Sequence, residues 1–240
     1  MDLTRLLGRL ATGAPVPVFP VTGAGRRSHV QDLRLAAGVE IVASPRAAVV
    51  LLVAGDVAGT HVEPLARVHD LMPHPRATVS WRGGGPLADG WPAVSVEPDE
   101  DPVAVLRRVA ADLLAGARPS DPPVLPDVDP VEWRAVGPYG QGGSGMTGGT
   151  PYGRPMAELG PDRDGLRLDI LPVTVGPFVP WLPPGLVLEV KLAGDLVVEA
   201  AVAPAASDAL SLVPPDPGPF VRALHEPVLV AEREVARARA

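Results

Sequence analysis

The sequence contains no cysteine, which excludes disulfide bonds, thiolate nucleophiles and every metal or cluster site that depends on cysteine ligands. Lysine is almost absent too, since Lys191 is the only one, and the formal net charge is -7. Such a chain offers no basic face for the phosphates of a nucleic acid. We therefore expect no nucleic-acid partner.

Long apolar runs are also missing, because no stretch approaches the roughly 18 apolar residues that a membrane span needs. The first ten residues, MDLTRLLGRL, include Asp2 and lack the apolar region and cleavage site of a signal peptide. These features predict a cytoplasmic protein without a direct membrane span. Such a protein could still be peripheral on the cytoplasmic membrane through its partners.

The residues that are present indicate a globular chain built from short elements. Hydrophobic residues make up 46% of the 240 positions, but the 31 prolines and 26 glycines require many turns and loops. We expect three regions: a domain over residues 1–118, a Pro/Gly-rich linker and arm over 119–160, and a smaller domain over 161–240.

The first region reads as an α/β unit. The run Val49–Val53 is typical of a buried parallel strand, and residues 61–72 place apolar side chains at helical spacing. Further strands are predicted at 77–81 and 91–96, and a further helix at 102–115. This order predicts a small parallel sheet of the flavodoxin-like type. A short helix is also possible over residues 3–11.

Helix ends carry their own signals. Thr60 is a candidate cap for the first of these two helices and Pro73 a stop. The second has Asp101 as its cap, Pro102 at its first position and Gly116 at its end.

The last region has a different periodicity, which predicts a mainly antiparallel β domain. Apolar and polar residues alternate over 166–175, 186–192 and 196–202, and the last two runs are joined by Ala193-Gly194-Asp195, a hairpin signal. The tail, residues 220–240, predicts a C-terminal amphipathic helix with a basic last turn. Between the domains, residues 118–131 alternate prolines with acids, which favours an extended connector.

Three nearby histidines, His61, His69 and His74, suggest a metal site at first sight. His61 and His69 are about two helical turns apart, and Pro73 separates His74 from the helix, so the three do not converge as an i, i+4 pair would. We interpret them as solvated or capping histidines and expect no metal.

The glycine-rich run Gly140–Gly149 superficially resembles a phosphate-binding loop. It lacks the Lys-Ser/Thr ending and the strand-to-helix context of such loops, so an arm that contacts a partner through Tyr139, Met146 and Tyr152 fits better. No catalytic triad or pair of cleft acids can be assembled. The acids at 99–101 fit the charge preference of a helix start.

Two stretches carry a family resemblance. ASPRAAVVLLVAGDV (43–57), followed by EPLARVHDLMPHPRATVSWRGG (63–84), resembles the PSST-type subunit of respiratory complex I and its relatives in membrane-bound [NiFe] hydrogenases. The likeness covers roughly residues 18–116. It depends on Ser44-Pro45-Arg46, Val53-Ala54-Gly55 and the segment Asp70–Arg76, which follow one another at the spacing of that family.

The resemblance implies a [4Fe-4S] cluster held by four cysteines, and this chain has none of them. Gly25 and Ser28 stand where hydrogenase-like members carry Cys-x-x-Cys, Gly84 lies near the next ligand, and the last falls around Asp99. Glycine has no ligand atom and an isolated serine does not replace thiolates. We therefore expect a scaffold that holds no cofactor.

A second resemblance covers about residues 164–203. GPFVPWLPPGLVLEVKLAGDLVVEA is similar to the N-terminal sheet of the complex I large subunit, in which two loop histidines reach the quinone pocket. Val179 and Pro183 or Pro184 stand in their places, so the loop has no proton donor for a quinone.

Together the resemblances suggest a fusion of two degenerate partners, with no catalytic residue of its own. The expected function is that of a non-catalytic structural or assembly subunit, whose partners are other subunits of a complex I-like (NADH-quinone oxidoreductase-related) or hydrogenase-related membrane complex. One alternative is an active oxidoreductase subunit that uses partner-supplied redox centres. Another is a small-molecule binding protein that uses Gly140–Gly149.

Overall fold

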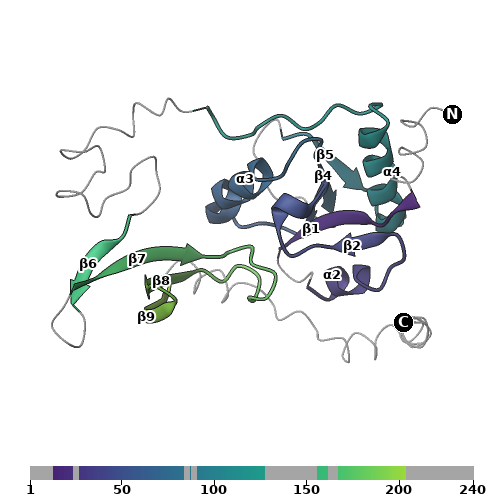
Figure 1. Ribbon diagram of the computed structural model, residues 1–240. Coiled ribbons are helices and arrows are strands. Elements are labelled where there is room, and N and C mark those ends of the chain that lie inside the picture. The colour runs from purple at the N-terminus through teal and green to yellow at the C-terminus, as the bar shows by residue number, and fades with distance from the viewer. Residues whose placement is uncertain are drawn as a thin grey trace, which may run out of the picture. The chain divides into compact units, whose positions relative to one another are not determined.

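The computed structural model describes residues 13–23, 27–83, 87, 91–127, 156–161 and 167–203 (Figure 1). These residues divide into two compact units. The first runs to Leu125 and includes Pro183–Gly185, and the second contains the other described residues from Pro126 onward. The first unit thus extends past the expected boundary at residue 118. The expected helix at 3–11, the glycine-rich arm and the C-terminal helix lie outside the described residues.

The first unit is built on a five-stranded parallel sheet with the order β2-β1-β3-β4-β5. This is the flavodoxin-like strand order, so the predicted α/β class is confirmed. The strands are β1 (Val16–Thr22), β2 (Val39–Ile41), β3 (Val50–Ala54), β4 (Ala77–Trp81) and β5 (Ala93–Val96). The helices are α2 (Arg27–Leu33), α3 (Val62–Asp70) and α4 (Pro102–Leu114), with short 3-10 turns η1 (Pro45–Ala47) and η2 (Gly59–His61).

Strand β1 was not predicted, because Pro17 and Pro20 argue against a central strand. The register explains how both are tolerated. Pro17 precedes the first pair between β1 and β3, which is Val18 with Val50, and Pro20 follows the last pair between β1 and β2, which is Val18 with Ile41. The backbone groups of Val16 and Val18 bond toward β2, and the Pro17 carbonyl bonds toward β3. Because these directions alternate along a parallel strand, the missing N–H of Pro17 faces β3 and that of Pro20 faces β2. Neither proline has a paired residue on that side.

The core lies between the sheet and its helices. Strand β3 is buried along its whole length, as the run of valine and leucine predicted. Helix α4 buries the residues at i, i+1, i+4, i+5 and i+8 from Val105 against the sheet: Val105, Leu106, Val109, Ala110 and Leu113. Each large aliphatic side chain buried in this way contributes roughly 1.5–3 kcal/mol.

The ends of the helices are partly as expected. Asp101 caps α4 by accepting a hydrogen bond from the Val103 N–H, Pro102 is at its first position, and Gly116 follows its end with a φ of +70°. The expected Thr60 cap of α3 is wrong. Thr60 lies within η2, and the cap position is His61, whose side chain makes no capping bond.

The second unit is a four-stranded antiparallel sheet with the order β6-β7-β8-β9, as the alternating pattern predicted. Its strands are β6 (Glu158–Pro161), β7 (Arg167–Val175), β8 (Leu188–Ala193) and β9 (Leu196–Val202). Gly194 supplies the left-handed φ of +61° that the tight turn between β8 and β9 requires. Across both units, no described helix has the length and apolar character to span a membrane.

Candidate functional site

The carboxyl edge of the parallel sheet is where ligands bind in flavodoxin-like folds, next to the point at which β1 and β3 diverge. The positions that the resemblance relates to cluster cysteines follow β1, β4 and β5 in the chain, and parallel strands end at one edge. Asp99 is exposed in the turn after β5, and Ser28 belongs to α2, although its side chain lies outside the described atoms. Gly25 and Gly84 also lie outside the described residues.

Close backbone contacts link the chain segments at the described part of this edge. The Gly23 N–H donates to the Ala54 carbonyl at 2.7 Å, and the Gly55 N–H donates to the Trp81 carbonyl at 2.9 Å. A Cβ on Gly23 would collide with the backbone of Asp56, and one on Gly83 with the backbone of Gly55. The chain segments after β1, β3 and β4 are therefore in backbone contact, which only glycine permits.

Trp81 is the last residue of β4 and therefore lies at this edge. Its ring is buried, with His29 packed edge-on at 5.6 Å between ring centroids and the Arg82 guanidinium 5.8 Å from the ring centre. Edge-on ring packing and cation–π contact both stabilise this end of β4.

A four-cysteine cluster does not fit these residues. The chain has no thiolate, Gly25 and Gly84 have no ligand atoms, and the edge is packed by glycine backbone.

The loop between β7 and β8 contains Val179, Pro183 and Pro184, the residues that the resemblance aligns with quinone-loop histidines. Val179 and Pro184 are half-buried and Pro183 is exposed. The Val179 carbonyl accepts a hydrogen bond from the Leu182 N–H at 3.0 Å, which folds the loop back on itself. None of the three side chains can transfer a proton.

The three histidines have separate environments. The expectation that they are solvated or capping is wrong for two of them, because His61 is 6% exposed and His69 is fully buried. His74 is exposed, and its Nδ1 lies 2.6 Å from the Ser120 hydroxyl. Within the described residues, no group of three His, Asp or Glu side chains could hold a metal ion.

The most developed polar cluster is a structure at the amino edge of the sheet that we call the α3 clasp: His69, Asp70, Arg76, Arg118 and Asp121. His69, which is at the end of α3, donates from Nδ1 to Asp70 Oδ1 at 2.8 Å. Its Nε2 lies 3.8 Å from Asp121 Oδ2, beyond hydrogen-bond distance, and its ring packs edge-on against Trp91 at 5.0 Å. The imidazole is thus enclosed by two carboxylates and an indole.

Arg76 forms hydrogen bonds to three other members of the clasp. Its guanidinium donates to the carbonyls of His69, Met72 and Asp121 and to Asp70 Oδ1, at 3.0–3.3 Å. The side chain is 2% exposed, so these bonds compensate for removing it from water. Four acceptors in different directions suit the planar fork of arginine and could not all be reached by lysine.

The two carboxylates fasten residues 118–125 onto the first unit. Asp121 accepts from the Thr78 N–H of β4 at 2.7 Å and from Arg118 at 3.2 Å. Asp70 accepts from the N–H groups of Val124 and Leu125 at 3.1 and 3.0 Å. This segment, expected as an extended connector, is held by specific hydrogen bonds.

These contacts set the ionisation of both acids. Burial by itself raises the pKa of Asp70, but hydrogen bonds from the Leu125 N–H, His69 and the Val124 N–H bring that pKa below its ordinary value. Burial likewise raises the pKa of Asp121, and the nearby His69, Arg118 and Thr78 bring it below its ordinary value. Two ionised carboxylates therefore face two guanidinium groups in the clasp.

Sequence reasoning did not find Asp121 or Arg118. Asp121 accepts from Thr78, which lies 43 positions earlier, and its neighbours Ser120, Pro122 and Pro123 look like those of any linker.

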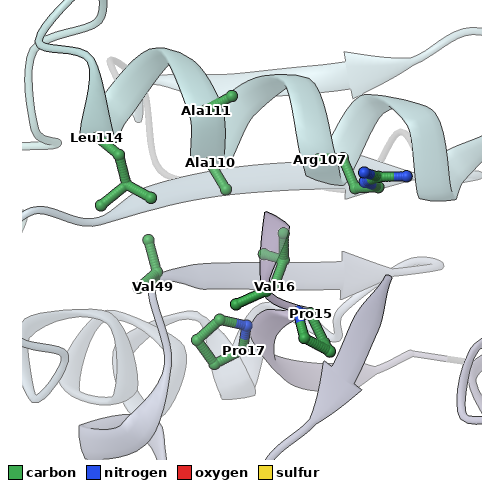
Figure 2. Close-up of a pocket in the computed structure, with 9 residues that line it drawn as sticks. Pro15, Val16, Pro17, Val49, Arg107, Ala110, Ala111 and Leu114 are labelled. Carbon is green, nitrogen blue, oxygen red and sulfur yellow. The ribbon is translucent and has the colours of Figure 1, made fainter. Parts of the chain in front are cut away.

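A shallow pocket lies at the amino end of β1 against α4 (Figure 2). Its lining is apolar apart from Arg107, and includes Pro15, Pro17, Val49, Ala111 and Leu114. One guanidinium among aliphatic side chains provides no acid–base pair, so this pocket is not a candidate active site.

A scan against models of known families matches none, and a search of curated proteins finds no similar sequence.

Proposed function

We propose that the chain is a non-catalytic structural or assembly subunit of a complex I-like, NADH-quinone oxidoreductase-related, or hydrogenase-related membrane complex. The partners would be other subunits of that complex. The residues that carry the resemblance would then be retained because they maintain a fold that partners recognise.

The observation that carries this proposal is the role of the family-like residues. Ser44 accepts a hydrogen bond from the Arg46 N–H and caps η1, whose first residue is Pro45, just before β3. The segment Asp70–Arg76 supplies two members of the α3 clasp, Asp70 and Arg76. Both motifs serve the fold, whereas the positions that would hold a cluster carry no thiolate.

A candidate contact for a partner is the outer edge of β9, which pairs with no other described strand and is called its free edge below. This strand ends the sheet, all seven of its residues are exposed, and its only charge, Glu199, is paired with Lys191 at 2.7 Å. An edge strand with few charges can accept a strand from another chain.

The test is purification of the tagged chain from membranes of cells that encode it, followed by identification of bound proteins and measurement of iron. We expect colourless protein that carries membrane-complex subunits at fixed stoichiometry. Stoichiometric iron in the isolated chain would contradict the proposal, as would normal assembly of the complex in cells that lack the chain. Tight nucleotide binding by the isolated chain would instead favour the small-molecule alternative.

Two variants of Ala200 test whether the free edge of β9 binds a partner. The Ala203 N–H bonds to the Val187 carbonyl, so the alternation of an antiparallel ladder turns the Ala200 N–H toward the free edge. Ala200→Pro removes that donor without breaking a bond to β8, and we expect it to reduce recovery of the partner subunits. Ala200→Thr keeps the N–H and should bind normally; equal recovery with both variants would exclude this edge.

A further inference from the structure

The shallow pocket in the first unit has two walls, one from α4 and one from the start of β1 with Val49 (Figure 2). Positions 107, 110, 111 and 114 follow the spacing i, i+3, i+4 and i+7, so the α4 wall is one face of that helix. Residues 14–17 and Val49 form the other wall. All nine lining residues belong to the described part of the first unit.

Most of the pocket is apolar. Leu114, at one end of the α4 wall, is 47% exposed, so a large aliphatic side chain beside the pocket is in contact with water. Pro15, Pro17 and Val49 line the opposite wall. A molecule that covers these side chains removes apolar surface from water, which is favourable. The pocket therefore selects an apolar group for most of the length of a ligand.

The backbone of the two walls offers a ligand few hydrogen-bond donors. Pro15 and Pro17 have no N–H. The Val16 N–H donates to the Gly38 carbonyl and the Val49 N–H to the Pro17 carbonyl, both at 3.0 Å. The α4 wall lies beyond the first turn of its helix, where N–H groups bond to the carbonyls four residues earlier. A polar group on a ligand must therefore be bound by a side chain.

Arg107 is the charged side chain among the lining residues. Within the described residues its guanidinium has no ion-pair or hydrogen-bond partner, whereas the neighbouring Arg108 pairs with Glu100. A guanidinium presents a planar fork of N–H donors that matches the two oxygens of a carboxylate. The pocket thus combines apolar walls with one cationic anchor.

Gly38 sets the position of the Arg107 side chain. Gly38 has a φ of +90°, and a Cβ there would lie 3.1 Å from Arg107 Cδ and 3.3 Å from Nε. The stem of the arginine therefore runs closely over the glycine backbone, at the end of the pocket opposite Leu114 (Figure 2). Since this contact restricts the side chain, binding an anion costs less conformational entropy than it would at a freely moving arginine.

The α4 wall also sets the length of a ligand. Positions 107 and 114 are separated by two helical turns, or about 10 Å along the axis. An extended alkyl chain of roughly six to eight carbons that ends in a carboxylate covers this distance. Such a molecule reaches Arg107 with its carboxylate and Leu114 with its methyl end.

We propose that this pocket binds a free, short aliphatic monocarboxylate, with the carboxylate on Arg107 and the alkyl chain along α4 toward Leu114. A protein C-terminus is a poorer ligand, because it would place amide groups beside its carboxylate and against the apolar walls. This inference does not depend on the proposed function, and it involves neither the α3 clasp nor the carboxyl edge of the sheet.

Titration of the isotopically labelled full-length protein with sodium hexanoate tests the proposal, with amide chemical shifts as the readout. We expect saturable shifts at Val16, Val49 and Ala111, with a dissociation constant in the millimolar range. Acetate has the charge without the chain, and hexanol has the chain without the charge. Each should bind at least about fivefold more weakly than hexanoate at the same ionic strength.

Two adjacent arginines of α4 provide a matched pair of variants. Arg107→Gln removes the anchor, and we expect it to raise the dissociation constant for hexanoate at least about fivefold. Arg108→Gln makes the same change at an exposed side chain that does not line the pocket, and should stay within about twofold of the native protein. Equal binding by the two variants would overturn the proposal. So would the absence of saturable shifts in the native protein, or hexanol binding as tightly as hexanoate.

A second pair of variants tests the place of the alkyl chain. Ala111→Leu fills the pocket from the α4 wall and should abolish the saturable shifts, while Ala104→Leu adds the same atoms at an exposed position of α4 outside the pocket. We expect Ala104→Leu to bind hexanoate normally. Amide spectra of both variants check that they fold. Undiminished hexanoate binding by a folded Ala111→Leu protein would show that the chain lies elsewhere and would contradict the proposal.

Discussion

Replacing Asp121 by alanine tests the α3 clasp most directly. The substitution removes the acceptor of the buried Thr78 N–H and the partner of Arg118 at once. An unsatisfied buried donor costs about 1–3 kcal/mol. Breaking a buried charge pair by removing one partner costs about 3–5 kcal/mol. Arg118 keeps some exposure, so water recovers part of the second cost, and the combined loss should be about 3–5 kcal/mol.

That loss is a large share of the stability of a domain, which is about 5–15 kcal/mol. Urea unfolding followed by tryptophan fluorescence measures it, because the buried rings of Trp81 and Trp91 lie in this unit. Asp121→Asn keeps one acceptor oxygen and should lose less. Amide exchange at Thr78 should accelerate in Asp121→Ala beyond the change in global stability.

Asp99→Ala is the matched control. This aspartate is exposed, and the same substitution there should change stability by less than about 0.5 kcal/mol. If the two alanine variants unfolded at the same urea concentration, the clasp would not stabilise the fold as its hydrogen bonds indicate.

Two further predictions concern pH and glycine packing. The folded pKa values of Asp70 and Asp121 lie below the ordinary 3.8, so their stabilisation is fully present above about pH 4 and is lost as pH falls through the lower folded values. Urea unfolding between about pH 2 and 6 should show this loss, and Asp121→Asn should show a smaller one; parallel curves would contradict it. Gly23→Ala should lower the free energy of unfolding by about 1–3 kcal/mol, because the new Cβ meets the backbone of Asp56. Gly59→Ala, where a Cβ meets nothing within 4 Å, is the thermal-unfolding control, and equal melting temperatures would refute the packing argument.

The elements with strong local signals were predicted well. The apolar run at β3 and the Asp101-Pro102 start of α4 are each specified by a few adjacent residues. Strand β1 was missed because its two prolines fit only where the pairing with β3 has not yet begun or the pairing with β2 has already ended. Strand β2 has three residues, which is too short for a period to be recognised.

The candidate site likewise has one feature that the sequence predicts and another that only the fold creates. The lack of thiolate ligands follows from the sequence alone, because no fold can supply an absent atom. The close backbone approach at Gly23 and Gly83 depends on three strands that meet at one edge. No property of those glycines in the linear chain distinguishes them from Gly59, where a Cβ would have space.

Composition and periodicity by themselves determined the α/β and antiparallel classes, because side-chain alternation and helix caps are local properties. Only the tertiary structure decided the fate of the ionisable residues. His69 became a buried partner of Asp70 rather than a solvated side chain, and Asp121 became an acceptor for β4 rather than a linker acid. Burial and hydrogen bonding between distant residues arise from packing, and packing is a property of the folded chain as a whole.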